Sequence, residues 1–177
     1  MKKYLLIFLI FSFLEPEANS QETQTTKLNE LDFLLRTWKI DAGSRLSAEG
    51  PWEKTSGISV IKNKLNSTII EEEFTGTRQG KSFLNKTLFG INNMNNKLQR
   101  VFADSEHGVL IEFEGEKSKD TIYFDKTWTY ASGSTMKLRA AYYIISEDEF
   151  RVETMRMPQN ATEWDITSRV KYNRIKK

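Results

Sequence analysis

From residue 37 onward, short segments in which apolar and polar residues alternate follow one another to the end of the chain. A period of two is typical of β-strands. The candidate strands cover 37–46, 52–62, 66–74, 81–91, 97–104, 108–115, 119–128, 134–145, 149–157 and 163–174. The gaps between them are short and polar, and none is long enough for a crossover helix. The sequence therefore predicts an all-β protein whose neighbouring strands run antiparallel.

A flat sheet of about ten antiparallel strands would expose two edges, and closure into a barrel removes both. We therefore expect a closed or nearly closed up-and-down β-barrel. A barrel of this size can enclose a cavity instead of a filled core. In the last strand we expect one face to carry Trp164, Ile166, Val170 and Tyr172, and the other Asp165, Thr167, Arg169 and Lys171. Alternation alone does not decide which face points inward.

A short helix is predicted just before the strands. Leu28, Leu31, Leu34 and Leu35 have helical spacing over about residues 27–35. A helix this short is not stable alone, so its apolar side must dock on the rest of the protein. On the barrel interpretation, these leucines close one end and Trp38 packs beneath them as a plug. Any ligand would then enter at the other end.

The first twenty residues have the features of a secretory signal peptide. Lys2 and Lys3 precede the apolar stretch 4–14, which is too short to span a membrane, and no other stretch is long enough. Small residues before Gln21 favour cleavage there. We expect a signal peptide over 1–20, a flexible leader over 21–27, and a single barrel domain over 28–177. The mature protein should be exported, to the periplasm or outside a bacterial cell, without a stable membrane span.

Composition argues against several classes of function. Lys plus Arg number 26 against 24 Asp plus Glu, and the charges are interleaved, so no nucleic-acid partner is expected. The chain has no cysteine, which excludes disulfides and a cysteine-linked lipid anchor. Metal sites built from His and Cys clusters are excluded as well. We expect neither a metal nor a cofactor.

Two further features are interpreted as surface positions. The single histidine, His107, falls at a hairpin tip, where solvation is the usual outcome, although haem ligation is the alternative. The run Glu71-Glu72-Glu73 is interpreted as part of a solvated strand, with Glu72 on the face opposite to its two neighbours. Asp104 and Glu106 could hold a hard cation, but this spacing is common by chance.

The helix-to-strand junction Leu34-Leu35-Arg36-Thr37-Trp38 resembles the G-x-W entry of lipocalins and related calycin barrels, with Arg36 in place of the usual glycine. Three other stretches resemble an uncharacterised exported family, the domain of unknown function 1579. They are Phe89-Gly90-Ile91-Asn92 with Lys97-Leu98 and Phe102-Ala103-Asp104-Ser105, then Leu138-Arg139, and finally Thr162-Glu163-Trp164 with Arg169, Tyr172 and Arg174. The resemblance implies a lipocalin-like or fatty-acid-binding-like barrel, and no established activity.

Candidate ligand-binding residues are arginines and aromatic residues spread over several strands. They are Trp38, Phe89, Arg100, Phe102, Arg139, Tyr143, Arg156, Trp164, Arg169 and Tyr172. An arginine inside a barrel without a fixed partner would favour an anionic ligand. Asp104, Asp125 or Asp165 could instead pair with a buried arginine. Fatty-acid-binding barrels carry an Arg-x-Tyr clamp, but the spacing from Arg169 to Tyr172 puts these two residues on opposite faces.

Three functions remain open from the sequence. The leading hypothesis is a non-catalytic protein that holds a small hydrophobic or amphipathic molecule in the barrel, with an arginine near any acid group. The second is an isomerase or cyclase that uses one carboxylate or tyrosine in a dry pocket. The third is a structural or interaction domain whose barrel is filled. A titratable group deep in the barrel beside a tyrosine would favour the second hypothesis.

Overall fold

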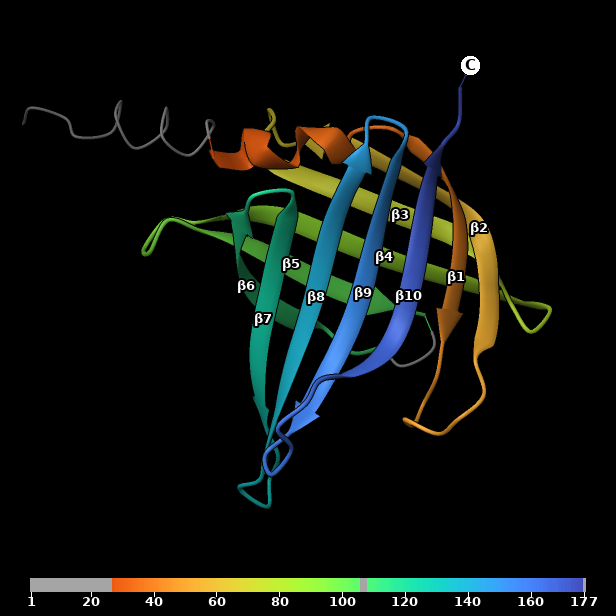
Figure 1. Ribbon diagram of the computed structural model, residues 1–177. Coiled ribbons are helices and arrows are strands. Elements are labelled where there is room, and N and C mark those ends of the chain that lie inside the picture. The colour runs from red at the N-terminus through yellow and green to blue at the C-terminus, as the bar shows by residue number, and fades with distance from the viewer. Residues whose placement is uncertain (1–26, 106–107, 177) are drawn as a thin grey trace, which may run out of the picture.

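The computed structural model describes residues 27–105 and 108–176, and they form a closed ten-stranded antiparallel β-barrel (Figure 1). The 3-10 helix η1 (Asn29–Leu34) comes first. It is followed by β1 (Thr37–Ser44), β2 (Glu53–Lys64), β3 (Ile69–Arg78), β4 (Lys81–Asn92), β5 (Lys97–Asp104), β6 (Ile111–Ser118), β7 (Thr121–Thr129), β8 (Thr135–Ser146), β9 (Glu149–Pro158) and β10 (Asp165–Arg174). The predicted fold class is confirmed, and the predicted helix is a 3-10 helix.

Every strand pairs with its neighbours in the sequence, and β1 pairs with β10 to close the barrel. The closing pair runs in register from Trp38 opposite Arg174 to Ser44 opposite Ser168. Because the sheet closes on itself, no strand has a free edge. The predicted signal peptide and all but the last residue of the predicted leader lie outside the described residues. Among the described residues, no helix is long and apolar enough to cross a membrane.

Two strands begin three residues later than predicted, a larger difference than at the other strand starts. β3 starts at Ile69 and not at residue 66, because Leu65, Asn66 and Ser67 all adopt positive φ angles of 47°, 54° and 66°. This left-handed turn carries the chain around before pairing resumes. β6 likewise starts at Ile111 and not at residue 108.

A β-bulge changes which residues of β10 face inward. The pairing with β9 shifts between Ile166 and Ser168, so Asp165 lies opposite Arg156 and Ser168 lies opposite Thr154. The extra residue reverses the alternation before this point. Val170 and Tyr172 share a face as predicted, and it is the inner one. Placing Trp164 and Ile166 with them is wrong, since Asp165 takes the inner face there.

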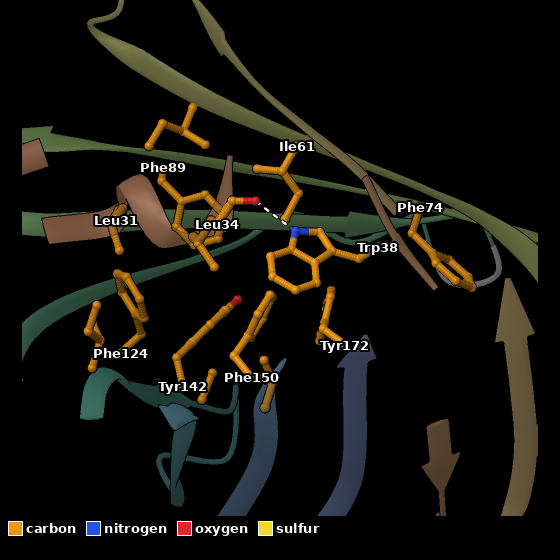
Figure 2. Packing of buried hydrophobic residues seen from close by; sticks show 14 of the residues in the cluster. Leu31, Leu34, Trp38, Ile61, Phe74, Phe89, Phe124, Tyr142, Phe150 and Tyr172 are labelled. Atoms are coloured by element: carbon orange, nitrogen blue, oxygen red, sulfur yellow. Dashed lines mark hydrogen bonds between the residues drawn. The ribbon is translucent and has the colours of Figure 1, made fainter. Parts of the chain in front are cut away.

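The helix end of the barrel is closed by a dense apolar cluster (Figure 2). Leu31 and Leu34 are fully buried, and the indole Nε1 of Trp38 donates a hydrogen bond to the Leu34 carbonyl at 2.8 Å. The Phe150 ring lies edge-on to Trp38 at 4.8 Å and stacks on Tyr172 at 4.0 Å between ring centroids. The predicted cap and plug are confirmed. We call this the capped end and the opposite end the open end.

Arg36, which replaces the family's glycine, follows η1 at the capped end. Its carbonyl accepts a hydrogen bond from the amide of Ile61 at 2.9 Å, which ties the helix junction to the end of β2. Its side-chain Nε is buried without a hydrogen-bond partner. The backbone of Arg36 therefore has a role in the junction, while nothing in the structure explains its side chain.

Two glycines allow a close backbone approach between β2 and β3. Gly57 lies directly opposite Gly76, and a Cβ atom at either position would come within 2.2 Å of a backbone oxygen. Such a distance is far inside van der Waals contact, so any side chain would push the two strands apart. The inner ring of Phe74 fills the space beside both glycines.

Candidate functional site

Five polar side chains point into the barrel from neighbouring strands and are buried there. They are Thr55 and Ser59 of β2, Glu72 of β3, Thr87 of β4 and Arg100 of β5. Buried charges are rare in proteins unless they are paired or hydrogen-bonded. The environments of Glu72 and Arg100 therefore define the candidate site.

Glu72 is only 3% exposed and accepts two hydrogen bonds on Oε1. Ser59 Oγ donates one at 2.7 Å. Tyr172 of β10 (Figure 2) donates the other through Oη at 2.9 Å. Burial and the adjacent Glu72 carboxylate hold the pKa of Tyr172 well above its usual value. Tyr172 therefore remains a neutral hydrogen-bond donor at physiological pH.

The neighbours of Glu72 lie on the outer face of β3. Glu71 pairs with Lys64 at 3.3 Å, and Glu73 pairs with Lys86 at 3.0 Å. The prediction of a solvated strand is right for these two residues and wrong for Glu72. The signal was present in the sequence, because Glu72 falls in phase with Ile70 and Phe74, which are both buried.

Arg100 is 7% exposed and projects from β5 among aromatic rings. Its Nε donates a hydrogen bond to Tyr142 Oη at 3.0 Å, and its guanidinium carbon lies 5.0 Å from the ring centroids of both Phe102 and Phe113. Within residues 27–105 and 108–176, no carboxylate forms an ion pair with Arg100. Among the described residues, the groups in direct contact with its guanidinium are thus a phenol oxygen and aromatic faces.

Tyr142 connects the two halves of this cluster. Burial raises its pKa to about 12, and the nearby Arg100 charge opposes this shift, while Glu72 adds to it. Arg100, Tyr142, Glu72, Tyr172 and Ser59 therefore lie within electrostatic reach of one another. We call these five residues the polar cluster.

Beyond the polar cluster, burial decreases toward the open end along β7 and β9, whereas Phe83 near the start of β4 stays buried. Along β7, Ile122 and Phe124 are buried, whereas the inward-facing Lys126 and Trp128 are only half-buried. Along β9, the inward-facing Phe150 and Val152 are buried, whereas the next two inward-facing residues toward the open end, Thr154 and Arg156, are half-buried. The inward-facing side chains of these two strands are therefore more exposed at the end opposite η1, where the sequence predicts that a ligand enters.

A set of charges lies at the open end. The Asp165 carboxylate accepts a hydrogen bond from Arg156 Nε at 3.1 Å and another from Arg45 Nη2 at 2.8 Å. Asp165 thus pairs with two partly exposed arginines. Asp125 likewise pairs with Arg139 at 2.7 Å on the outer face. The sequence proposed these aspartates as partners of a buried arginine, but the buried Arg100 donates its hydrogen bond to Tyr142.

The predicted ligand-binding residues divide between the two faces of the barrel. Inward-facing residues are Trp38, Phe89, Arg100, Phe102, Arg156 and Tyr172, and outward-facing residues are Arg139, Tyr143, Trp164 and Arg169. Arg139 stacks between the rings of Tyr123 and Trp164, at 4.9 and 4.8 Å. Arg169 and Tyr172 lie on opposite faces, as their spacing predicts. Only the inward-facing set can line a ligand site in the barrel.

Sequence reasoning missed Ser59, Glu72 and Tyr142 as members of the site. Tyr142 alternates with the candidate Tyr143, and only the burial of its neighbours Ala140 and Val152 shows which tyrosine faces inward. The haem alternative through His107 and the cation alternative through Glu106 concern residues outside the described ones.

Residues 24–174 match a family described as a protein of unknown function, DUF1579. The chain belongs to the DUF1579 family. This match covers the whole barrel, so the resemblance noted in the sequence is confirmed. No curated protein matches the sequence of this chain.

Solved structures place this DUF1579 protein among β-barrels. An S-type phycobiliprotein lyase from Guillardia theta has a TM-score of 0.56 at 12% identity, covering 92% of this chain and 99% of the other. A designed fluorescence-activating β-barrel gives 0.45 at 12% identity, covering 81% and 95%. A DUF3598 protein from Nostoc punctiforme gives 0.26 at 10% identity, covering 84% and 99%. At these identities the first likeness concerns the fold alone, and the other two carry no argument.

Proposed function

We propose that this DUF1579 barrel is an exported binding protein that holds a small amphipathic molecule with its acid group at Arg100. The observation that carries this proposal is the burial of Arg100 without an ion-pair partner among the described residues. Export rests on the predicted signal peptide alone.

The energetics of Arg100 favour an anionic ligand. A buried charge without an opposite charge in direct contact is costly, and part of that cost is relieved when an anion binds. Guanidinium groups bind carboxylates through two parallel hydrogen bonds, and only Nε of Arg100 is already used by Tyr142. The rings of Phe102 and Phe113 would contact the apolar part of the ligand next to its acid group.

The polar cluster also fits the other requirements of a ligand site. Ligand sites are mainly apolar with a few fixed polar groups, and here the polar groups sit between the apolar capped end and the open end. The likeness to a protein titled a phycobiliprotein lyase supports a fold that can accommodate such a site. The ligand would enter from the open end and direct its acid group inward.

The proposal is tested with a fluorescent carboxylate, 11-(dansylamino)undecanoic acid, and its methyl ester. We expect the acid to bind the wild-type protein, and Arg100→Met to weaken binding at least tenfold. Arg139→Met is the matched control, because Arg139 lies on the outer face, and it should leave binding unchanged. The ester should bind the wild-type protein and the Arg100→Met variant equally. Equal binding of the acid to wild-type and Arg100→Met protein, with both folded by circular dichroism, would contradict the proposal.

A second candidate function rests on Glu72. A buried carboxylate beside a tyrosine is the arrangement by which an isomerase or cyclase would move a proton, and Glu72 lies 2.9 Å from Tyr172 Oη. The test is to identify co-purifying molecules by mass spectrometry and to incubate them with wild-type and Glu72→Gln protein. Conversion of a co-purifying molecule by the wild-type protein and not by Glu72→Gln would favour an enzyme. Recovery of the molecule unchanged from both proteins would favour the binding protein.

A further inference from the structure

We propose a second binding site on the outside of the barrel, for a small anion carried on a flat ring system. It lies in a groove of about 730 Å³ that crosses β8, β9, β10, β1 and the start of β2. The outward-facing residues that line it are Asp41, Gly43, Trp52, Lys54, Tyr143, Ile145, Arg151, Glu153, Arg169 and Lys171. We call it the outer groove.

The outer groove is hollow because of Gly43. In the sheet register, Gly43 lies between Lys54 of β2 and Arg169 of β10, and it is the only one of the three without a side chain. The Trp52 ring packs over this gap, since a Cβ atom on Gly43 would lie 3.1 Å from Trp52 Cε3. A side chain at position 43 would fill the groove or displace Trp52.

Two cations hold Trp52 in place as a wall of the groove. The guanidinium carbons of Arg45 and Arg169 lie 4.9 and 5.2 Å from its ring centroid. Trp52 nevertheless remains 38% exposed, so part of its ring is available to a ligand. The exposed Ile145 and the ring of Tyr143 form the opposite side.

The charges that reach the surface of the groove are mainly positive. Arg151 and Arg169 have side chains that are 56% and 60% exposed. Their ion-pair partners Glu149 and Glu153 are only 21% and 27% exposed, so the carboxylates lie beneath the cations. Lys171, also paired with Glu149, is 43% exposed. Asp41 is an exposed carboxylate in the same groove, but the cations Lys54, Arg151, Arg169 and Lys171 outnumber it, so the rim attracts anions.

These features specify the ligand class. The volume matches that of small-molecule sites, and the walls offer one indole and one phenol ring. The cations would bind a sulfonate, carboxylate or phosphate on the ligand. The ring and cations of the site belong to the outer face, because Tyr143 and Arg169 face away from Tyr142 and Val170, although Ala42, Val152 and Val170 also border the groove.

The test uses 8-anilinonaphthalene-1-sulfonate, an anionic aromatic probe, and N-phenyl-1-naphthylamine, which lacks the sulfonate. Binding is followed by the indole N–H signals of the four tryptophans in ¹⁵N NMR spectra, since each reports a different place. We expect the sulfonate probe to shift the Trp52 signal, and the uncharged probe to shift it with at least tenfold weaker affinity.

Variants separate the outer groove from other sites. Arg169→Glu should weaken the Trp52 response at least tenfold, whereas Arg139→Glu, also an outer-face arginine beside a tryptophan, should leave it unchanged. Arg100→Met should not affect the Trp52 response, whether or not the interior binds a ligand. An unmoved Trp52 signal, or equal responses in Arg169→Glu and wild-type protein, would overturn the proposal.

Discussion

The two ends of the barrel use their inward-facing residues differently. At the capped end, Leu31, Leu34, Trp38 and Phe150 are almost completely buried and pack on one another. At the open end, the inward-facing Lys126, Trp128 and Arg156 are half-buried, and charges are paired near solvent. The polar cluster lies between these ends. The difference suggests that stability is concentrated at one end, which leaves the other free for binding.

The largest expected effect tests this division with two tryptophans. Trp38→Ala should lower the free energy of unfolding by about 3–5 kcal/mol, because it removes a fully buried side chain and its cavity cannot collapse fully. Trp128→Ala at the open end should cost about 1 kcal/mol, because that side chain is half-buried. Urea unfolding of both variants measures the difference. Similar losses would show that the open end is as important for stability as the capped end.

Alkaline pH tests the polar cluster beside the capped end. Tyr142 has a pKa of about 12 when folded, against about 10 for an exposed phenol, so the folded state holds the proton more tightly. Its contribution is complete below about pH 10 and is lost as the pH rises toward 12. We expect the free energy of unfolding to fall by about 2 kcal/mol from this residue between about pH 9 and pH 11.5.

Tyr172 adds a loss in the same direction, because its pKa is also raised. Urea unfolding at the two pH values measures the decrease, and Tyr142→Phe is the control. This variant should show a smaller decrease with pH than the wild-type protein. An identical pH dependence in the two proteins would mean that Tyr142 is not shielded from solvent by the fold.

A hydroxyl deletion on each face of the wall gives a smaller effect. Tyr172→Phe removes a donor to the buried Glu72 and should cost about 1–3 kcal/mol. Tyr143→Phe removes an outer hydroxyl that lies 3.5 Å from Glu153, and it should change stability by less than about 0.5 kcal/mol. Thermal unfolding of the two variants makes the comparison. A larger loss for Tyr143→Phe would reverse the assigned roles of the two faces.

The smallest expected effect concerns the outer-face ion pair of Arg139 and Asp125. Both side chains are substantially exposed, so solvent and salt screen their attraction. A double-mutant cycle with Arg139→Ala and Asp125→Ala should give a coupling energy below about 1 kcal/mol. The coupling should decrease further in high salt. A strong coupling that does not depend on salt would show that this outer-face ion pair contributes substantially to stability, contrary to the expectation that the buried interior dominates.

Most of the fold could be predicted from the sequence because turn length and alternation act locally. Short polar gaps leave antiparallel pairing as the only choice, and this gave the ten strands and the closed barrel. Leu31, Leu34 and Trp38 were predicted as cap and plug from the helical spacing together with the barrel interpretation. The bulge before Ser168 was not predicted, because one extra residue in a strand leaves no clear pattern in the sequence.

The candidate site was harder to predict, because alternation sorts residues into two faces without saying which one is inside. Arg100, Phe102 and Tyr172 were proposed and face inward, whereas Arg139 and Arg169 were proposed and face outward. Glu72 was missed because a glutamate in an acidic run is usually solvated. Its burial depends on Ser59 and Tyr172, which are distant in sequence, with Tyr172 one hundred residues away.

The pairing of β1 with β10 also determines the order in which the chain can fold. These strands are the first and the last, and the amide of Ile175 bonds to the carbonyl of Thr37 at 3.0 Å. The barrel can therefore close only after nearly all of the chain has been synthesised, and contacts so distant in sequence form slowly. Until then β1 keeps an unpaired edge that can associate with other chains. A chain ending before residue 165 would keep that edge permanently and should aggregate.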